Sequence, residues 1–284
     1  MWAAPDKGLP ETKDASRIVT RPRIASLVPS LTELLFELGL GPWLVARTGF
    51  CIYPRDAVAA VAKVGGTKDV NLTKLRRLAP THVLVNIDEN RRETVDAIRS
   101  WSAADGPAAP RIIVTHPLAP DDNLALVDRL LEHFGALDGV AERATGFLES
   151  LRNELEQTRP EGRPMQRVLY LIWREPWMTV ARDTYIARML GRVNWHTLPE
   201  LDGGASGAAR YPVVRGDEPW LAQVDQVLLS SEPYAFTQVH VDEAKGLCPN
   251  AQVRLVDGEM LSWYGARTVP GLRYLRQIAA SLWQ

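Results

Sequence analysis

The chain has 284 residues, of which 46% are hydrophobic and 24% are charged, and its 33 basic and 34 acidic residues leave a net charge of −1. This length accommodates two domains of ordinary size, and the composition is typical of a globular protein. The near-neutral charge argues against nucleic-acid binding, which needs a basic excess. No run of about 18–20 apolar residues predicts a transmembrane helix. Two cysteines, Cys51 and Cys248, exclude a framework of several disulfides and a four-cysteine zinc site.

The first 22 residues are polar and carry charges throughout. They contain no apolar core of about 7–15 residues, which a secretory signal peptide requires. We therefore expect residues 1–22 to form a polar N-terminal arm. The protein is expected to be cytoplasmic if Met1 is the native start, and periplasmic if a signal sequence has been removed.

Short apolar strands alternate with helices over residues 23–120. The first strand, Arg23–Val28, precedes a helix in which Ser30 and Glu33 have the spacing of a capping box. Further strands are predicted at Leu44–Arg47, Thr81–Asn86 and Arg111–Thr115, and further helices at Leu72–Leu78 and Glu89–Ser102. This alternation predicts βαβ units and a mainly parallel sheet.

Helical periodicity fills residues 121–160. Asp138 and Gly139 separate or bend two predicted helices. The second of them, Val140–Thr158, has a predicted length of about 28 Å at the usual rise per residue. A helix of that length between two α/β regions is expected to act as a stiff connection.

The alternation resumes over residues 161–284. Strands are predicted at Arg167–Ile172, Gln226–Leu229 and Val253–Val256, helices at Asp183–Leu190 and Leu272–Leu282, and a loop at Gly203–Arg215. The sequence therefore predicts an α/β protein in which two lobes with mainly parallel sheets, residues 23–120 and 161–284, are joined by a long rigid backbone helix within residues 121–160.

Residues that follow the predicted strands are rich in aromatic side chains with a polar group. Ligands of open α/β sheets bind beyond the carboxyl ends of the strands, so these positions predict a cleft between the lobes. Such rings suit a large, flat, partly polar ligand. The alternative is that the tryptophans anchor strand ends in two separate cores. The predicted ligand-binding residues are Cys51, Tyr53, Lys68, Glu89, Asn90, Trp173, Arg174, Trp177, Tyr211, Trp263 and Tyr264.

The aromatic members of this set are expected to form the walls of the cleft, and the charged and amide members its polar contacts. Arg174 lies beside Trp173 and near Trp177, and an arginine in that setting both stacks and pairs with carboxylate or phosphate. Lys68 pairs either with an acidic ligand group or with a nearby carboxylate. Cys51 is interpreted as a small apolar wall residue or as a single axial or reactive contact.

The sequence contains no motif that demands catalysis. A Gly-x-Ser-x-Gly turn, a Walker loop and a Gly-x-Gly-x-x-Gly turn after the first strand are all absent. The five histidines show no paired spacing for a metal ion. We therefore predict a non-enzymatic protein with no catalytic residues and no protein-only metal site. An enzyme or metal chaperone centred on Cys51 remains as a minor alternative.

Several motifs together resemble a known family. The segments RIASLVPSLTELLFELGL and VGGTKDVNLTKLRRLAPTHVLVN, followed by the long connecting helix, are similar to the helical-backbone metal receptor superfamily. Its members are the solute-binding proteins of ABC importers for cobalamin, haem and ferric siderophores. The resemblance covers residues 23–283, and FCIYP, GGTKD, IWREPWM, DTYI and SWYG resemble the cobalamin-binding-like branch.

The resemblance implies two lobes on a rigid helix, with the ligand between them and little hinge closure. It implies cobalamin, haem or a ferric chelate as a reversibly bound ligand, no tightly bound cofactor, and an ABC permease as the partner of a monomer. Cobalamin receptors carry a tryptophan in the loop where this chain has Thr67.

In this family an acidic residue on each lobe docks on the permease. The matching residue is Asp217 or Glu218 on the second lobe, whereas the matching residue on the first lobe is the uncharged Thr73. Thr73 and the polar first 22 residues favour an alternative function, that of a cytoplasmic cofactor- or metal-trafficking protein that reuses the same fold.

Overall fold

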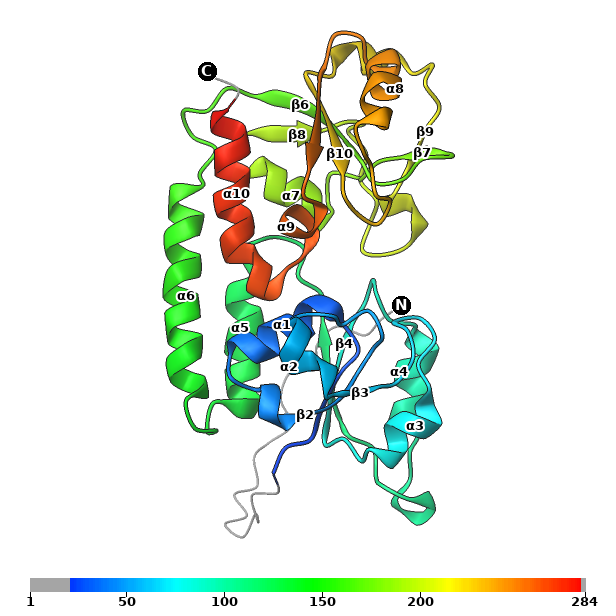
Figure 1. The fold of residues 1–284 in the computed structure, drawn as a ribbon, viewed down its shortest axis with the longest axis vertical. Coiled ribbons are helices and arrows are strands. Elements are labelled where there is room, and N and C mark those ends of the chain that lie inside the picture. The colour runs from blue at the N-terminus through cyan, green and yellow to red at the C-terminus, as the bar shows by residue number, and fades with distance from the viewer. Residues whose placement is uncertain (1–20, 282–284) are drawn as a thin grey trace.

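Two parallel sheets, one in each half of the chain, form two lobes along the long axis of the molecule (Figure 1). The computed structural model describes residues 21–281, so most of the predicted polar arm lies outside the described residues. Within residues 21–281, no helix has the length and hydrophobicity that a bilayer-spanning segment needs.

The N-terminal lobe is built on a five-stranded sheet with the order β3-β2-β1-β4-β5, in which every pair is parallel. Buried apolar strands such as β4 are typical of parallel sheets that are covered on both faces. The strands are β1 (Ile24–Ser26), β2 (Leu44–Arg47), β3 (Ala62–Lys63), β4 (His82–Asn86) and β5 (Arg111–Thr115). The helices are α1 (Pro29–Glu37), α2 (Arg55–Ala59), α3 (Leu72–Arg77) and α4 (Arg92–Arg99), with 3₁₀ turns η1 (Gly41–Trp43) and η2 (Ala103–Asp105).

The start of α1 differs from the predicted capping box. The helix begins at Pro29, and its N-cap is Val28, whose side chain makes no capping hydrogen bond. Proline suits the first helical position because its missing N–H is one of the donors that a helix start leaves unpaired. Ser30 therefore lies within the helix, and Glu33 is directed to Arg267 instead of back to the helix start.

The C-terminal lobe contains a four-stranded parallel sheet with the order β11-β10-β6-β8 and a small antiparallel pair, β7-β9. The strands are β6 (Gln166–Leu171), β7 (Trp177–Met178), β8 (Trp195–Thr197), β9 (Val213–Val214), β10 (Gln226–Ser230) and β11 (Gln252–Val256). The helices are α7 (Tyr185–Gly191), α8 (Val239–Leu247), α9 (Gly258–Ser262) and α10 (Thr268–Ala280), with 3₁₀ turns η3 (Ala208–Arg210), η4 (Pro219–Gln223) and η5 (Gly265–Arg267). The predicted loop at Gly203–Arg215 thus contains η3 and β9.

The lobes are connected by α5 (Asp122–Phe134) and α6 (Val140–Gln157). Gly139, with φ of +73°, separates the two helices. The 18 residues of α6 correspond to about 27 Å. Figure 1 shows α6 running along one side of the molecule, where it packs on α5 and α10.

One apolar cluster is continuous through both lobes. It contains Ile24 and Leu84 from the N-terminal sheet, Leu228 from the C-terminal sheet, and residues such as Leu151 of α6 and Leu272 of α10 between them. Separate apolar clusters cover the outer faces of the two sheets. The connection between the lobes is therefore a shared core, and α6 is only one of its parts.

A close approach between α1 and η5 tightens this connection. Gly265 has φ of +77°, and a Cβ atom at this position would lie 3.2 Å from the Ser30 carbonyl oxygen and from Leu34 Cβ. Its backbone N–H donates a 2.6 Å hydrogen bond to Asn123 Oδ1 of α5. A glycine is required here because larger residues disfavour this φ and this spacing.

The predicted α/β class with mainly parallel sheets is confirmed.

Candidate functional site

Residues that follow the strands of one lobe contact residues that follow the strands of the other. Tyr53, in the loop after β2, meets Trp263, which follows α9, in an edge-to-face pair with ring centroids 6.1 Å apart. The Arg267 guanidinium lies 4.5 Å from the centroid of the Tyr53 ring and 4.8 Å from that of Trp263. Tyr53 and Trp263, which were both predicted as ligand-binding residues, therefore contact the same arginine from opposite lobes. Arg267 itself was not predicted from the sequence.

Arg267 also joins the lobes by charge. Its Nε donates to Glu33 Oε2 of α1 at 2.7 Å, and its Nη1 donates to Glu259 Oε2 of α9 at 2.5 Å. The arginine side chain is 11% exposed. Desolvation alone would lower the pKa of Arg267, but the hydrogen bond and charge of Glu33 outweigh it and raise that pKa. Arg267 is thus a fixed cation at the lobe boundary.

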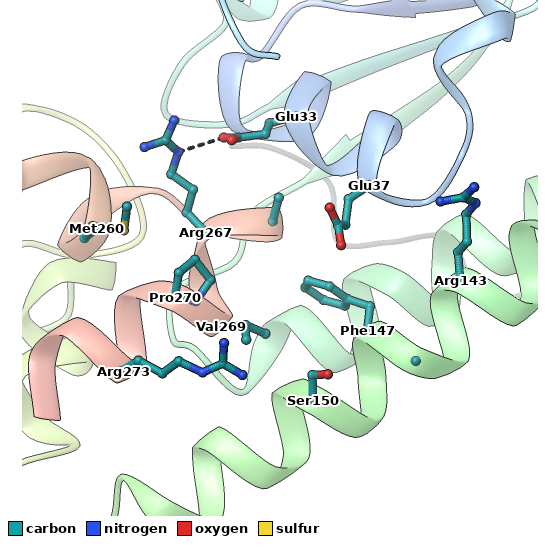
Figure 2. A pocket seen from close by; sticks show the side chains of 12 residues that line it. Glu33, Glu37, Arg143, Phe147, Ser150, Met260, Arg267, Val269, Pro270 and Arg273 are labelled. Carbon is teal, nitrogen blue, oxygen red and sulfur yellow. Dashed lines mark hydrogen bonds and ion pairs between the residues drawn. The ribbon is translucent and has the colours of Figure 1, made fainter.

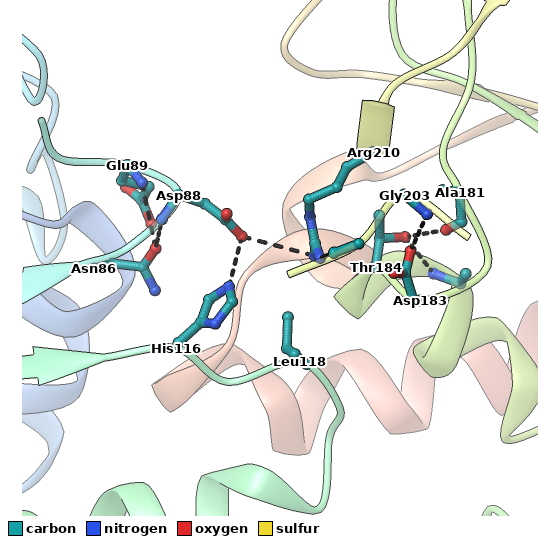
Figure 3. A network of polar contacts seen from close by, with 12 residues as sticks. Asn86, Asp88, Glu89, His116, Leu118, Ala181, Asp183, Thr184, Gly203 and Arg210 are labelled. Carbon is teal, nitrogen blue, oxygen red and sulfur yellow. Dashed lines mark hydrogen bonds and ion pairs between the residues drawn. The ribbon is translucent and has the colours of Figure 1, made fainter. Parts of the chain in front are cut away.

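A polar network crosses the lobe boundary at Asp88, which follows β4 (Figure 3). Asp88 Oδ2 lies 3.1 Å from His116 Nε2 and 3.7 Å from Arg210 Nη2 of the C-terminal lobe. Lys68 Nζ donates a 2.6 Å hydrogen bond to the Asp88 backbone carbonyl. Burial by itself raises the pKa of Asp88, but the hydrogen bond from His116 and the charge of Arg210 outweigh burial, so that this pKa is lowered overall.

Arg210 is a buried cation, with 2% of its side chain exposed. Its Nη1 donates to the Gly204 carbonyl at 2.8 Å, and its Nε atom has no hydrogen-bond partner. The Cα atom of Arg210 lies 2.4 Å from the place where a Cβ atom on Gly203 would be. This close packing holds the arginine beside the acidic residues of the opposite lobe.

Glu89, the neighbour of Asp88, is bonded across the boundary as well. Tyr264 Oη donates to Glu89 Oε1 at 3.0 Å. Burial raises the pKa of Glu89 to about 7. The charges of Asp88 and Glu232 raise this pKa too, whereas the hydrogen bond from Tyr264 and the charge of Lys68 oppose the shift. Glu89 is therefore a carboxyl group that titrates near neutral pH.

A cavity of about 140 Å³ lies between the lobes at this network. Burial raises the pKa of Tyr211, which lines the cavity, and the charge of Asp88 adds to the shift. Residues of both lobes form the walls, among them Asn86, Asp88, Glu89, Arg210, Tyr211 and Tyr264. Three predicted residues, Glu89, Tyr211 and Tyr264, are thus brought together.

A second aromatic group lies in the C-terminal lobe alone. Trp173, which follows β6, is 41% exposed and forms an edge-to-face pair with Tyr234. Trp177 stacks on Phe236 with an interplanar angle of 7°. Arg174 lies over Trp177 and bonds Glu175 and Glu243 at 2.5 and 2.6 Å. The predicted rings therefore belong to two groups rather than to one continuous wall.

Two predicted residues have structural contacts within the N-terminal lobe. Asn90 is 3% exposed, its Oδ1 accepts from the Asn86 N–H, and its Nδ2 donates to the Leu27 and Thr67 carbonyls. This side chain therefore holds the turn after β4 and has no free amide group for a ligand. α4 begins only at Arg92, later than predicted, because residues 87–90 form that turn.

Cys51 is fully buried, in contrast to its predicted place on the cleft wall. Its Sγ atom lies 3.1 Å from Thr48 Oγ1, whereas its neighbours Phe50 and Ile52 are exposed. Burial raises the pKa of the Cys51 thiol despite hydrogen bonds to threonine hydroxyls. No group of three or more His, Cys, Asp or Glu residues within residues 21–281 has the geometry of a metal site.

Both cysteines are expected to be unreactive in the native protein. Cys51 and Cys248 are buried, and burial raises the pKa of Cys248 to about 11. Because the thiolate is the reactive form, a thiol-specific disulfide reagent at pH 7.5 should label the native chain at least about 100-fold more slowly than the denatured chain. Reaction of one thiol per native molecule within minutes would contradict this prediction. The same labelling of a Cys248→Ala variant would then show which of the two cysteines reacts.

The predicted docking residues lie in the loop before η4. Both carboxylate oxygens of Glu218 accept hydrogen bonds from the Arg215 and Gly216 N–H groups, at 2.8 to 3.1 Å. Burial raises and these hydrogen bonds lower the pKa of Glu218, with a net lowering. Asp217 is exposed. Glu218 therefore shapes the loop, and Asp217 presents its side chain to solvent.

A larger groove of about 770 Å³ lies between α1, α6 and α10 (Figure 2). Its walls carry charges of both signs, including Glu37, Arg143 and Arg273. Arg267 and Arg273 already pair with carboxylates, the latter with Glu154 at 2.6 Å. Apart from Arg267 and its partner Glu33, none of the residues described above at the lobe boundary lines this groove.

Comparison with known proteins places the fold. No protein-family model matches the chain. The chain is 23% identical to the uncharacterised ABC transporter substrate-binding lipoprotein YvrC of Bacillus subtilis over 272 residues, 90% of this chain and 79% of YvrC. It is 25% identical to the vitamin B12-binding protein of Vibrio cholerae over 228 residues, 77% of this chain and 71% of that protein.

Solved structures share the arrangement of the two lobes. The periplasmic vitamin B12-binding protein BtuF of Vibrio cholerae superposes with a TM-score of 0.74 and 19% identity, covering 92% of this chain and 98% of BtuF. The periplasmic haem-binding protein RhuT of Roseiflexus superposes with a TM-score of 0.71 and 19% identity, covering 93% of this chain and all of RhuT. The chain therefore has the fold of these two-lobed binding proteins.

The resemblance to the helical-backbone metal receptor superfamily noted in the sequence is confirmed, and the shared core and α6 agree with it. The named relatives are solute-binding proteins, a non-enzymatic class, in agreement with the expected binding protein. They are described as periplasmic proteins or as a lipoprotein, and so do not favour a cytoplasmic trafficking protein.

Proposed function

We infer that the chain is the substrate-binding protein of an ABC-type importer and binds a cobalamin-like or haem-like metal chelate between its lobes. The observation that carries this proposal is the meeting of Tyr53 and Trp263 from opposite lobes, beside a cavity whose walls come from both. The names of the relatives support the same class of ligand. The proposed location is outside the cytoplasmic membrane, where such relatives act.

The size of the cavity limits how such a ligand binds. Enclosed ligand pockets are usually about 300–1,000 Å³, larger than the cavity of about 140 Å³. The macrocycle is therefore proposed to lie in the open part of the cleft, against Tyr53, Trp263 and the exposed Trp173. A group on its edge reaches the cavity beside Glu89 and Tyr211. Two of the predicted residues, Cys51 and Asn90, are buried and are proposed to act only through the fold.

Docking on a permease is proposed to depend on the C-terminal lobe. Asp217 is exposed and free to pair with a permease arginine, whereas the carboxylate of Glu218 is occupied by backbone N–H groups. On the N-terminal lobe, Thr73 is exposed and uncharged, and α3 ends with Arg76 and Arg77. An acidic contact on both lobes is therefore not expected.

Ligand titration tests the proposed function. Isothermal calorimetry with cyanocobalamin, dicyanocobinamide, haemin and ferrichrome is expected to detect at least one chelate with a dissociation constant of about 1 μM or lower. A Trp263→Phe variant should weaken that binding by about tenfold, because interfacial aromatic residues contribute most of the binding energy. A Trp101→Phe variant is the control, since Trp101 packs against the outer core of the N-terminal lobe. Absence of heat with all four chelates would refute the proposal.

A further inference from the structure

Most arginines around the cleft are paired with carboxylates, whereas two of the carboxylates form no ion pair. This difference limits the chemistry of the ligand. The arginine cations are occupied: Arg267 binds two carboxylates, Arg210 lies beside Asp88, and Arg174 binds two carboxylates. Lys68 donates to a backbone carbonyl next to Glu89. The arginines at the lobe boundary therefore offer little to an anionic ligand group.

Two carboxylates at the lobe boundary form no ion pair, although the charge of Lys68 acts on one of them, Glu89. Glu232 follows β10, and its Oε1 accepts from the neutral donors Ser262 Oγ at 2.6 Å and Trp263 Nε1 at 2.7 Å. Glu89 Oε1 accepts from the neutral Tyr264 hydroxyl. Within residues 21–281, neither carboxylate forms an ion pair, and the hydrogen bonds that each accepts all go to its Oε1 atom.

The position of Glu232 is fixed by its surroundings. Gly258 at the start of α9 approaches it so closely that a Cβ atom there would lie 2.7 Å from Glu232 Cγ and 2.3 Å from Ser230 Oγ. Glu232 and Glu89 come from opposite lobes and repel one another electrostatically. The lobe boundary therefore holds two oriented acceptor groups, one from each lobe.

We propose that Glu89 and Glu232 receive N–H donors, amide or ammonium, on the edge of the bound chelate, and that a chelate with ionised carboxylates on its edge is disfavoured. This inference rests on the proposed function and narrows its ligand class. A corrinoid, whose ring edge carries neutral carboxamides, meets the requirement. Haem carries two propionates. These would lie against carboxylates of the same charge and beside arginines that already pair with other carboxylates, so haem binding is disfavoured.

The test compares dicyanocobinamide, which has the amide edge, with haemin at pH 8.0 by isothermal calorimetry. The wild-type chain is expected to bind dicyanocobinamide at least tenfold more tightly than haemin. Glu232→Gln should lower the affinity for dicyanocobinamide by about tenfold and raise that for haemin, because hydrogen bonds to a charged acceptor are the stronger ones. The glutamine Oε1 still accepts from Ser262 and Trp263, so the local structure is retained.

Glu149→Gln on the exposed face of α6 removes the same charge far from the cleft and should leave both affinities unchanged. Glu89→Gln gives a second measurement from the opposite lobe, with the same direction expected. Haemin binding as tight as that of dicyanocobinamide, or an unchanged ratio in both cleft variants, would overturn the inference while the receptor function stands. Failure of every chelate to bind would refute both this inference and the proposed receptor function.

Discussion

Replacement of Arg267 by methionine is expected to lower the free energy of unfolding by about 2–4 kcal/mol, because it leaves two half-buried carboxylates without their cation. Arg267 bonds Glu33 and Glu259 and lies over the rings of Tyr53 and Trp263. Loss of the cation–π contacts adds to the effect. Equilibrium unfolding in guanidinium chloride measures it.

The matched control is Arg182→Met. Arg182 bonds Asp202 through two nitrogens at 2.6 and 2.9 Å, but both side chains are exposed and belong to one lobe. Exposed ion pairs contribute little to stability, so this variant should unfold like the wild type. Equal losses in the two variants would show that the bridging position of Arg267 has no special role.

Replacement of Glu89 by glutamine is expected to stabilise the chain above neutral pH. Burial raises the pKa of Glu89 from its ordinary value of 4.5 to about 7. The folded wild-type chain therefore holds this proton more tightly than the unfolded chain does. The stability that the proton contributes is complete below pH 4.5 and is lost as the pH rises through about 7.

Glutamine stays neutral and still accepts the hydrogen bond from Tyr264, so it avoids that loss. The stability difference between Glu89→Gln and wild type should be small at pH 4.5 and should reach at most about 3 kcal/mol at pH 8. Urea unfolding at pH 4.5, 6, 7 and 8 measures it. Glu93→Gln, an exposed change on α4, controls for the lost charge. A stability difference between Glu89→Gln and wild type that does not change with pH would contradict the raised pKa of Glu89.

The main elements of the fold were predictable because each leaves a local signal. Alternation of short apolar strands with helices predicted the parallel sheets, and the apolar period of residues 121–160 with Gly139 predicted α5 and α6. The pair β7-β9 was not predicted, because two residues per strand give no period. The capping box at Ser30 was wrong because Pro29 already starts the helix.

The site was predictable only in part. The rule that parallel strands end at one edge located Tyr53 and Glu89, and the same rule applied to β10 would have found Glu232. Arg267 gives no such signal, since it lies in a 3₁₀ turn and its partner Glu33 is 234 residues away. Whether a side chain faces a ligand or its own backbone, as Asn90 does, depends on contacts that no local pattern encodes.

The apolar cluster that passes through both lobes has a consequence for how a ligand is captured. To swing apart, the lobes would have to bring leucine side chains of this cluster into water, at a cost of roughly 25 cal/mol for each Å² exposed. The geometry of the cleft is therefore set at folding, before any ligand arrives. Association then loses little conformational entropy in the protein, so that affinity depends on preorganised complementarity.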